Sequence, residues 1–309
     1  MNQLSVSPSP HLGTPDNTRS IMMDVIVALS LPSVFGIVMF GWHAALCIAV
    51  CVGSCVLFEY LGCKAFGHAN SIGDLSAVVT GLLLALNLPP LRLADIWIAV
   101  IGSFAAIFVV KQMFGGLGHN FVNPAIAARI ILLISFPGAM TTFYEPLRAN
   151  VVTSATPLAV AGQSGQYAIS DLIFGIHGGC IGETSVVFLA VGGLYLLIRG
   201  VISPVIPVSF IGSVALFSWI FGADPLYAVC SGGVMLGALF MATDYVTSPC
   251  TALGKLIFGI GCGALTAVIR SGSAAEGVSF AILFMNLLVS HIDRITVKKP
   301  FAWEGKPRE

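Results

Sequence analysis

The sequence contains very little charge. Only 9% of its 309 residues are Asp, Glu, Lys or Arg, whereas soluble domains carry about 25%. Hydrophobic residues make up 57% of the chain. Because so few charged side chains cannot cover a water-facing surface of this size, the composition excludes an ordinary soluble protein. It predicts an integral membrane protein in contact with lipid.

An excess of either sign of charge is also absent. Lys and Arg together number 14, as do Asp and Glu. The chain has no basic block and no acidic tail, so we expect no nucleic-acid partner. The first twenty residues are polar and lack the basic and then apolar order of a cleavable signal peptide. They are predicted to form a tail before the first helix.

Cysteine spacings typical of metal sites are missing. The eight cysteines include no CxxC pair and no Cys/His finger, so we expect no metal, zinc or iron–sulfur site held by this chain alone. Cys47, Cys51 and Cys55 are spaced i, i+4, i+8, which places them on one face of a helix. Two interpretations stay open, a row of thiolates or small apolar side chains in a tightly packed helix.

Ten apolar runs approach the length of about 20 residues that a helix needs to cross a bilayer. They cover residues 21–40, 42–60, 72–88, 96–113, 124–136, 185–198, 201–221, 226–241, 252–270 and 278–292. The fifth and sixth are short, and we expect them to be tilted, broken or extended into the loop between them. The sequence therefore predicts an all-α polytopic membrane protein with about ten transmembrane helices.

The positions of Lys and Arg predict the orientation of these helices. If the N-terminus is cytoplasmic, eleven basic residues fall on the inner side: Arg19, Lys64, Lys111, Arg129, Arg199, Lys255, Arg294, Lys298, Lys299, Lys306 and Arg308. The outer side holds only Arg92, Arg148 and Arg270. We therefore divide the chain into a cytoplasmic tail (1–20), five helices (21–137), an extracytoplasmic loop (138–184), five helices (185–296) and a second cytoplasmic tail (297–309).

Two stretches of the chain resemble each other. Residues 94–100 lead through an apolar run to 118–124, and residues 223–229 lead likewise to 243–249. This similarity predicts two duplicated five-helix halves with broken helices, as in many transporters. The helix count places both polar stretches on one side, whereas an inverted repeat would place them on opposite sides. A chance similarity and a miscounted helix both remain open.

Several polar residues lie in or beside the predicted helices. The acids at or near helix ends are Asp24, Glu59, Asp74, Asp95 and Asp244. Each is either solvated at the interface, a helix cap or part of a functional site. Asn120 and Asn123 precede Pro124 and follow several glycines. This pattern is typical of a well-formed helix start, and equally of a binding segment in a broken helix.

The long loop between the halves is rich in Gly, Ser, Thr and Asn. Loops longer than about 12–15 residues are usually functional or disordered. Within it, Thr153 and Ser154 precede Thr156 and Pro157. The residues alone leave two interpretations, an ordinary Ser/Thr turn closed by proline or a functional loop.

Three motifs in order resemble the D subunit of the Rnf electron-transport complex, which is related to the B subunit of the sodium-pumping NADH:quinone reductase. They are residues 76–86 (SAVVTGLLLAL), 115–125 (GGLGHNFVNPA) and 240–249 (FMATDYVTSP). The resemblance extends from the first helix to residues 291–293. It implies a membrane subunit that takes part in electron transfer between reduced ferredoxin and NAD, coupled to translocation of Na⁺ or H⁺ across a bacterial or archaeal cell membrane.

The resemblance also implies a covalent cofactor. In that family an outer loop carries FMN, joined through its phosphate to a threonine in a pattern resembling Asp-x-x-Ser/Thr-Gly-Ala-Thr. Thr153, Ala155 and Thr156 agree with this pattern, while Asn150 replaces Asp and Ser154 replaces Gly. Thr156 is therefore the expected flavin-bearing residue, with Thr153 and Ser154 beside it. Asn120 and Asn123 are further candidates for cofactor binding, for example to a second, non-covalent flavin such as riboflavin.

The partners implied by the resemblance are the other subunits of the complex: a second covalent-FMN subunit, iron–sulfur membrane subunits and an NAD-binding subunit. The chain itself has no dinucleotide-binding fingerprint, and no residue is expected to act as a catalytic acid or base. Two other functions stay open. A stand-alone channel or secondary transporter would not need Thr156, and a bare membrane scaffold would bind no flavin.

Overall fold

The computed structural model describes residues 17–68, 71–144, 153–154, 157, 167–183, 185–272 and 277–297, with only the backbone at 153–154. The first predicted half contains α1 (Thr18–Phe40), α2 (Trp42–Phe66), η1 (Ile72–Asp74), α3 (Ser76–Leu86), η2 (Leu93–Asp95), α4 (Trp97–Phe104), η3 (Ala105–Lys111), η4 (Gln112–Phe114) and α5 (Pro124–Ser135). Four short elements follow: α6 (Pro137–Met140), β1 (Phe143–Tyr144), β2 (Thr153–Ser154) and α7 (Ile169–Phe174). The second half contains α8 (Val186–Ile198), α9 (Val205–Ile220), α10 (Pro225–Cys230), α11 (Val234–Leu236), η5 (Gly237–Met241), α12 (Ala252–Gly272) and α13 (Gly277–Thr296).

The prediction of an all-α polytopic membrane protein is confirmed. In the described residues, five helices are long and apolar enough to cross a membrane: Thr18–Phe40, Trp42–Phe66, Leu93–Phe114, Ala252–Gly272 and Gly277–Thr296. Shorter apolar helices supply most of the other predicted spans. Large apolar side chains such as Val34, Ile198 and Val208 are more than half exposed. An outer surface of this kind is suited to lipid rather than to water.

The boundaries of several helices follow from single residues. Asn17 caps α1 by accepting a hydrogen bond from the Ser20 amide, and Gly41 separates α1 from α2 at φ +69°. A left-handed conformation of this kind favours glycine. Asn123 caps α5 in the same way as Asn17 caps α1, and Pro124 occupies its first turn. The Asn123-Pro124 pair therefore begins a regular helix. This agrees with the first of the two interpretations of this motif, a well-formed helix start.

Two of the spans depart from regular α-helix. The eighth is broken into α10 and α11 by residues 231–233, where Ser231 has an extended backbone. The fourth and the eighth spans both contain π-helical turns, η3 and η5, and in the fourth a short 3-10 turn, η4, follows η3. Such turns frequently mark functional sites, and both lead directly into the polar stretches seen in the sequence.

The contacts between helices agree with an inverted repeat of the two halves. The first helices of the halves, α1 and α8, pack together, as do the fifth, α5 and α13. The second and fourth helices pack in each half, α2 on α4 and α9 on α12. If each helix corresponds to the one five positions later, the two halves cross the membrane in opposite directions, because five is odd. The duplicated five-helix halves stay a prediction, with which these contacts agree.

The similarity between residues 94–124 and 223–249 does not belong to this repeat. It relates the fourth span to the eighth, which is an offset of four helices, whereas the packing has an offset of five. The helix count was nevertheless correct in placing both polar stretches on one side, because Asn123 of the first contacts Met241, at the start of the second.

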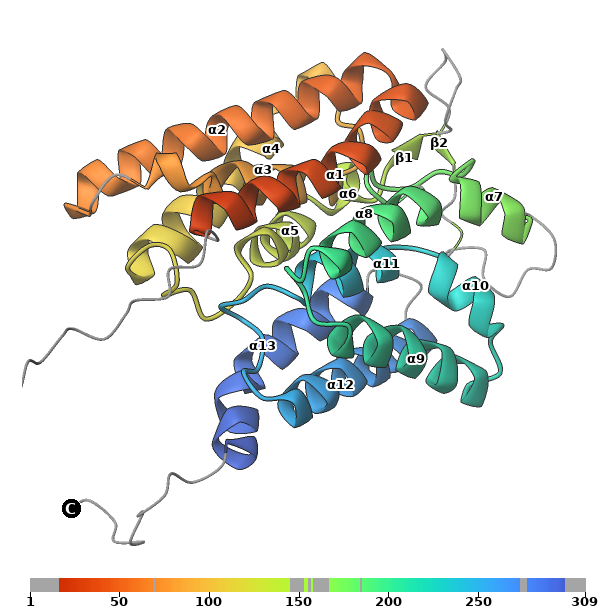
Figure 1. Ribbon diagram of the computed structural model, residues 1–309. Helices are drawn as coiled ribbons and strands as arrows, with labels where there is room; N and C mark the ends of the chain where they lie inside the picture. Colours follow the sequence, from red (N-terminus) through yellow and green to blue (C-terminus); the bar gives the residue numbers. More distant parts are fainter. Residues whose placement is uncertain are drawn as a thin grey trace, which may run out of the picture.

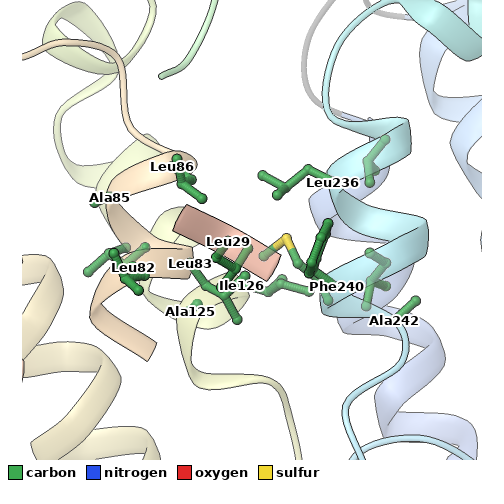
Figure 2. Close-up of a cluster of buried hydrophobic side chains, with 14 of the residues drawn as sticks. Leu29, Leu82, Leu83, Ala85, Leu86, Ala125, Ile126, Leu236, Phe240 and Ala242 are labelled. Carbon is green, nitrogen blue, oxygen red and sulfur yellow. The ribbon is translucent and has the colours of Figure 1, made fainter. Parts of the chain in front are cut away.

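A single apolar core joins the halves. Figure 2 shows side chains of α1, α3, α5 and the α11–η5 segment meeting there, among them Leu29, Leu83, Ile126 and Phe240. All four are at least 94% buried. The broken and shortened helices, α3 and η5, therefore end inside the protein rather than at its surface.

The helix bundle has two distinct ends. Figure 1 shows β1, β2, α7 and α10 gathered at one of them, which we call the loop end. The other, which we call the terminal end, is where α1 begins and α13 finishes. There Asp24 of α1 pairs with Arg199 at 3.1 Å, and Asp293 of α13 accepts a hydrogen bond from the Cys250 amide.

Candidate functional site

The residues that flank Thr156 are tied to the helix bundle. Thr156 itself lies outside the described residues. Before it, Thr153 and Ser154 form β2 and pair antiparallel with Tyr144 and Phe143 of β1. After it, Pro157 is buried, and its carbonyl oxygen accepts a hydrogen bond from the Tyr227 hydroxyl of α10 at 2.9 Å. The chain on both sides of position 156 is thus held at the loop end.

A hollow lies beside this strand pair. It has a volume of about 380 Å³ and is lined by Arg92, Asp95, Thr142 and Tyr144, together with residues of the 89–91 and 138–139 segments. The Arg92 guanidinium lies 5.6 Å from the centre of the Tyr144 ring, which suits a cation–π contact. The hollow therefore places a positive charge and an aromatic face next to the strand that precedes position 156.

A second cavity lies at the terminal end. It has a volume of about 120 Å³, and its walls come from α1, α3, η3, α5, α8, η5 and the segments that follow η4 and η5. Most of the lining is apolar, for example Leu83 and Phe240. The polar groups are Asn120, Asn123 and Asp244, with Ser76, Thr80, Lys111, Thr243 and Tyr245. Apolar walls with a few convergent polar groups are typical of a small-molecule site.

The predicted site residues are divided between these two places. Thr153 and Ser154 lie at the loop end, whereas Asn120 and Asn123 lie together in the cavity at the terminal end. Both asparagines are more than 90% buried. Asn123 also donates to the Met241 carbonyl at 3.2 Å, so it joins the start of α5 to the end of η5. Besides capping its helix, Asn123 lines the cavity, as the second interpretation of this motif required.

A chain of buried polar contacts runs from the cavity into the core. Asn123 contacts Met241, and the Asn87 amide donates to the Met241 sulfur at 3.3 Å. Asn87 in turn accepts from Arg129, which also pairs with Glu183 at 3.0 Å. The charge distribution of the sequence places Arg129 among the inner surface charges, but it is 97% buried. It is an internal ion-pair residue where the two halves meet.

Lys111 forms a second buried ion pair, with Glu59. Glu59 is among the acids named from the sequence, but Lys111 is counted there with the inner-side charges, and the pair is not predicted. Its ammonium lies 2.9 Å from Oε1 of Glu59 and 2.7 Å from the Ser76 hydroxyl. Ser71 donates to the same Glu59 oxygen. Lys111 is 2% and Glu59 0% exposed, so neither side chain is in contact with the surroundings of the protein. The signal that could have identified them is the presence of ionisable side chains inside apolar runs.

The other acids have simpler roles. Asp74 accepts hydrogen bonds from the amide and the hydroxyl of Ser76, the first residue of α3, although the N-cap position itself is Leu75. Asp24 accepts hydrogen bonds from Tyr195 and Arg199 at the terminal end. Asp95 lies in η2 beside the hollow, and Asp244 faces the cavity while it accepts from Thr247 at 3.0 Å. Of these, Asp244 is the acid with access to a ligand in the cavity.

The cysteine row of α2 is a packing feature. Cys47, Cys51 and Cys55 are fully buried, and the Ser103 hydroxyl of α4 donates to the Cys51 carbonyl at 3.3 Å. Gly81 of α3 leaves no room for a side chain beside Val52 of α2. Among the described residues, no group of three His, Cys, Asp or Glu side chains could hold a metal ion. The close approach of α2, α3 and α4 favours small buried side chains over a thiolate row.

Comparison with known proteins gives a consistent result. The family model for the NQR2, RnfD, RnfE family matches residues 5–302. The chain is 49% identical to the D subunit of the Na⁺-translocating ferredoxin:NAD⁺ oxidoreductase complex of Acetobacterium woodii, over 98% of this chain and 97% of that protein. It is 41% identical to the D subunit of the proton-translocating ferredoxin:NAD⁺ oxidoreductase complex of Clostridium ljungdahlii, over 97% of each chain. It is 39% identical, over 93% of each chain, to the D subunit of the ion-translocating oxidoreductase complex of Stutzerimonas stutzeri.

Proposed function

Because the chain belongs to the NQR2, RnfD, RnfE family, we propose that it is the D-type membrane subunit of an Rnf ion-translocating ferredoxin:NAD⁺ oxidoreductase complex. The sequence similarity covers nearly the whole chain. The ten apolar spans fit a multi-pass subunit of a bacterial cell membrane. Electrons and ions would move through the assembled complex, so the chemistry is shared with partner subunits.

The contribution of this subunit is electron relay through FMN bound covalently to Thr156. The observation that carries this proposal is the anchoring of the chain on both sides of position 156, through β1–β2 and through Tyr227. Arg92 in the adjacent hollow supplies positive charge where a phosphoester would place negative charge. A covalent tether replaces bimolecular binding by a high effective concentration. Thr156 is an attachment point and not a proton donor or acceptor.

A second flavin, of the riboflavin type and held without a covalent bond, is proposed for the cavity at the terminal end. Asn120 and Asn123 would bind the polar edge of the ring, and Leu83 and Phe240 would contact its faces. The cavity of about 120 Å³ is smaller than the ~300–1,000 Å³ of ordinary ligand pockets. Binding therefore requires lining side chains, such as Ile21 and Met22 of α1, to move aside.

NAD and ferredoxin would be bound by other subunits. The chain has no dinucleotide-binding fingerprint and no cysteine set for a cluster. The partners we propose are an NAD-binding subunit, iron–sulfur membrane subunits and a second covalent-FMN subunit. The translocated ion is Na⁺ or H⁺, and the names of two similar proteins differ on this point.

The proposed orientation places the terminal end in the cytoplasm and the loop end outside. The excess of Lys and Arg on the terminal side supports it. Lys111 and Arg129 no longer count toward that excess because they are buried, but the direction of the bias is unchanged. Thr156 would then carry FMN on the extracytoplasmic side.

Intact mass spectrometry of the subunit, purified with its complex, tests the proposal. We expect an added FMN phosphoester in the wild type, and none in Thr156→Ala, which should also lose acid-stable in-gel flavin fluorescence. Thr141→Ala is a matched control at the same end of the molecule, because the Thr141 hydroxyl donates only to the Pro137 carbonyl. A wild-type mass without FMN would refute the redox relay and favour a channel, a transporter or a scaffold.

A further inference from the structure

The hollow at the loop end contains two charged side chains of opposite sign. Arg92, which precedes η2, and Asp95, the last residue of η2, both line it. Among the described residues, neither side chain forms an ion pair or a hydrogen bond. Arg92 is exposed and Asp95 is half-buried, so both groups are accessible to a molecule that enters the hollow.

Tyr144 of β1 holds the Arg92 side chain at the wall of the hollow. The centre of its ring lies 5.6 Å from the guanidinium carbon. A contact of this kind uses the positive charge of arginine and leaves the N–H donors at the edge of the guanidinium to other acceptors. The Asp95 amide donates to the Arg92 carbonyl at 2.9 Å, so both residues belong to one turn. The hollow therefore offers a donor at Arg92 and a carboxylate acceptor at Asp95.

The size of the hollow suits a flat organic ring. Its volume of about 380 Å³ lies within the ~300–1,000 Å³ of ordinary ligand pockets. Pro89, Pro90 and Leu91 complete one wall. The isoalloxazine ring of a flavin is flat, and one of its edges carries carbonyl oxygens on either side of an N–H group. A donor and an acceptor side by side match that edge, so the residues present fit this ring.

The hollow lies within reach of position 156. Tyr144, which lines the hollow, pairs with Thr153 across β1–β2. Thr156 follows Thr153 by three residues, which span at most ~11 Å when fully extended. The ribityl chain of FMN adds to this reach. A ring attached through a phosphoester at Thr156 can therefore enter the hollow beside Tyr144.

Building on the proposed covalent FMN at Thr156, we propose that the hollow is the binding site of its isoalloxazine ring. Arg92 would donate to the carbonyl edge of the ring, Asp95 would accept from its N–H group, and Tyr144 is a positioning residue that holds Arg92. The reduced ring carries more negative charge than the oxidised ring. Arg92 therefore stabilises the reduced form, Asp95 opposes it, and together they set the midpoint potential of the flavin.

Redox titration of the purified complex tests the proposal, and the flavin component that disappears in Thr156→Ala belongs to this subunit. Arg92→Gln should lower the midpoint potential of that component, and Asp95→Asn should raise it. Each change should alter the preference for the reduced ring roughly tenfold, which is ~30 mV for a two-electron couple. Arg19→Gln and Asp171→Asn remove the same charges outside the hollow, and both should behave as wild type.

Variants of Tyr144 separate positioning from charge. Tyr144→Leu removes the ring that holds the guanidinium, so it should lower the midpoint potential in the same direction as Arg92→Gln but by less. Tyr144→Phe keeps a ring in place and should keep the wild-type potential. The pairing of β1 with β2 runs through the backbone, so we expect both variants to retain the strand pair.

A variant that fills the hollow tests the site without changing any charge. Gly138 of α6 lines the hollow, and a Cβ atom added there would meet nothing within 4 Å. Gly138→Phe should therefore fold, keep the mass of the attached FMN, and exclude its ring from the hollow. The fluorescence anisotropy of that flavin should then fall, because the ring rotates on its tether. Gly138→Ala is the matched control and should keep the wild-type anisotropy.

The results that would overturn the inference differ from those that would overturn the proposed function. An FMN mass on the subunit with one and the same midpoint potential in wild type, Arg92→Gln and Asp95→Asn would refute the ring site and leave the attachment at Thr156 intact. It would mean that Arg92 interacts at most with the phosphoester. An unchanged anisotropy in Gly138→Phe would also refute the ring site. A wild-type mass without FMN would refute the proposed function and this inference together.

Discussion

At the scale of single residues, the charged and polar groups of the interior are concentrated in a few buried contacts between helices and loops. Arg129 joins Asn87 of α3 to Glu183 of the loop before α8, and Lys111 joins Glu59 of α2 to Ser76 of α3. Such pairs cost desolvation energy that their attraction only partly repays. Their presence in an apolar core is therefore better explained by function than by stability.

Removing one partner of the Arg129 pair should destabilise the subunit strongly. Arg129→Met leaves Glu183 buried without its counter-ion, and we expect the free energy of unfolding to fall by about 3–5 kcal/mol. Thermal unfolding of the purified complex in detergent measures this loss of stability. Arg199→Met is the matched control, because its pair with Asp24 is half-exposed and worth about 0–1 kcal/mol. Equal losses in the two variants would contradict the assigned role of Arg129.

The Tyr227 hydroxyl should position the loop that carries Thr156. Tyr227→Phe removes its hydrogen bond to the Pro157 carbonyl, which is worth about 1 kcal/mol. We expect the docked loop to become roughly fivefold less favoured, and limited proteolysis between residues 145 and 166 to accelerate accordingly. Tyr195→Phe, which removes a hydroxyl contact with Asp24, is the control. No difference between the two variants would mean that β1–β2 alone holds the loop.

At the scale of elements, hydropathy predicted the ten spans but not their interruptions. Residues 226–241 form one apolar run in the sequence, whereas the chain breaks at residues 231–233 and finishes in a π-helical turn. Apolar periodicity reports burial and does not distinguish an α-turn from a π-turn. The pairing of Lys111 with Glu59, 52 residues apart, also needs the tertiary arrangement. Asn120 and Asn123 were identifiable because polar residues beside Gly and Pro stand out in an apolar chain.

Close helix packing makes particular glycines essential. A methyl group at Gly192 of α8 would lie 2.6 Å from the Ala28 carbonyl oxygen of α1. Gly192→Ala should therefore force apart the helices that join the two halves and lower stability by about 1–3 kcal/mol. Gly53→Ala on α2 meets nothing within 4 Å and should gain about 0.5–1 kcal/mol in helix propensity. The midpoint temperature of thermal unfolding should fall in Gly192→Ala and rise in Gly53→Ala. A shift in the same direction in both variants would contradict this packing.

At the scale of the whole molecule, the helix bundle has two chemically different ends. The cavity, Asp24, Arg199 and Cys250 lie at the terminal end, and the hollow, β1–β2 and Tyr227 lie at the loop end. The buried contacts of Asn87, Arg129 and Glu183 lie between them. The hollow and the cavity are thus at opposite ends of one helix bundle.

Cysteine labelling can test which end faces the cytoplasm without altering the native chain. Seven of the eight cysteines are buried, and Cys250 is exposed at the terminal end. A membrane-impermeant maleimide should therefore leave the wild type unlabelled in intact cells and label it in inverted membrane vesicles. Thr141→Cys, at the loop end, should add labelling in intact cells. Labelling of Cys250 from outside would reverse the proposed orientation.

The distance between the two ends has an electrical consequence. α1 alone has 23 residues, which at about 1.5 Å per residue matches the thickness of the hydrocarbon layer. Any electron passing between a cofactor at the hollow and one in the cavity would therefore travel along the transmembrane field. Each such transfer exchanges about 2.3 kcal/mol per 100 mV with the membrane potential. The electron step would then be electrogenic in its own right, and its rate should respond to voltage even before an ion has moved.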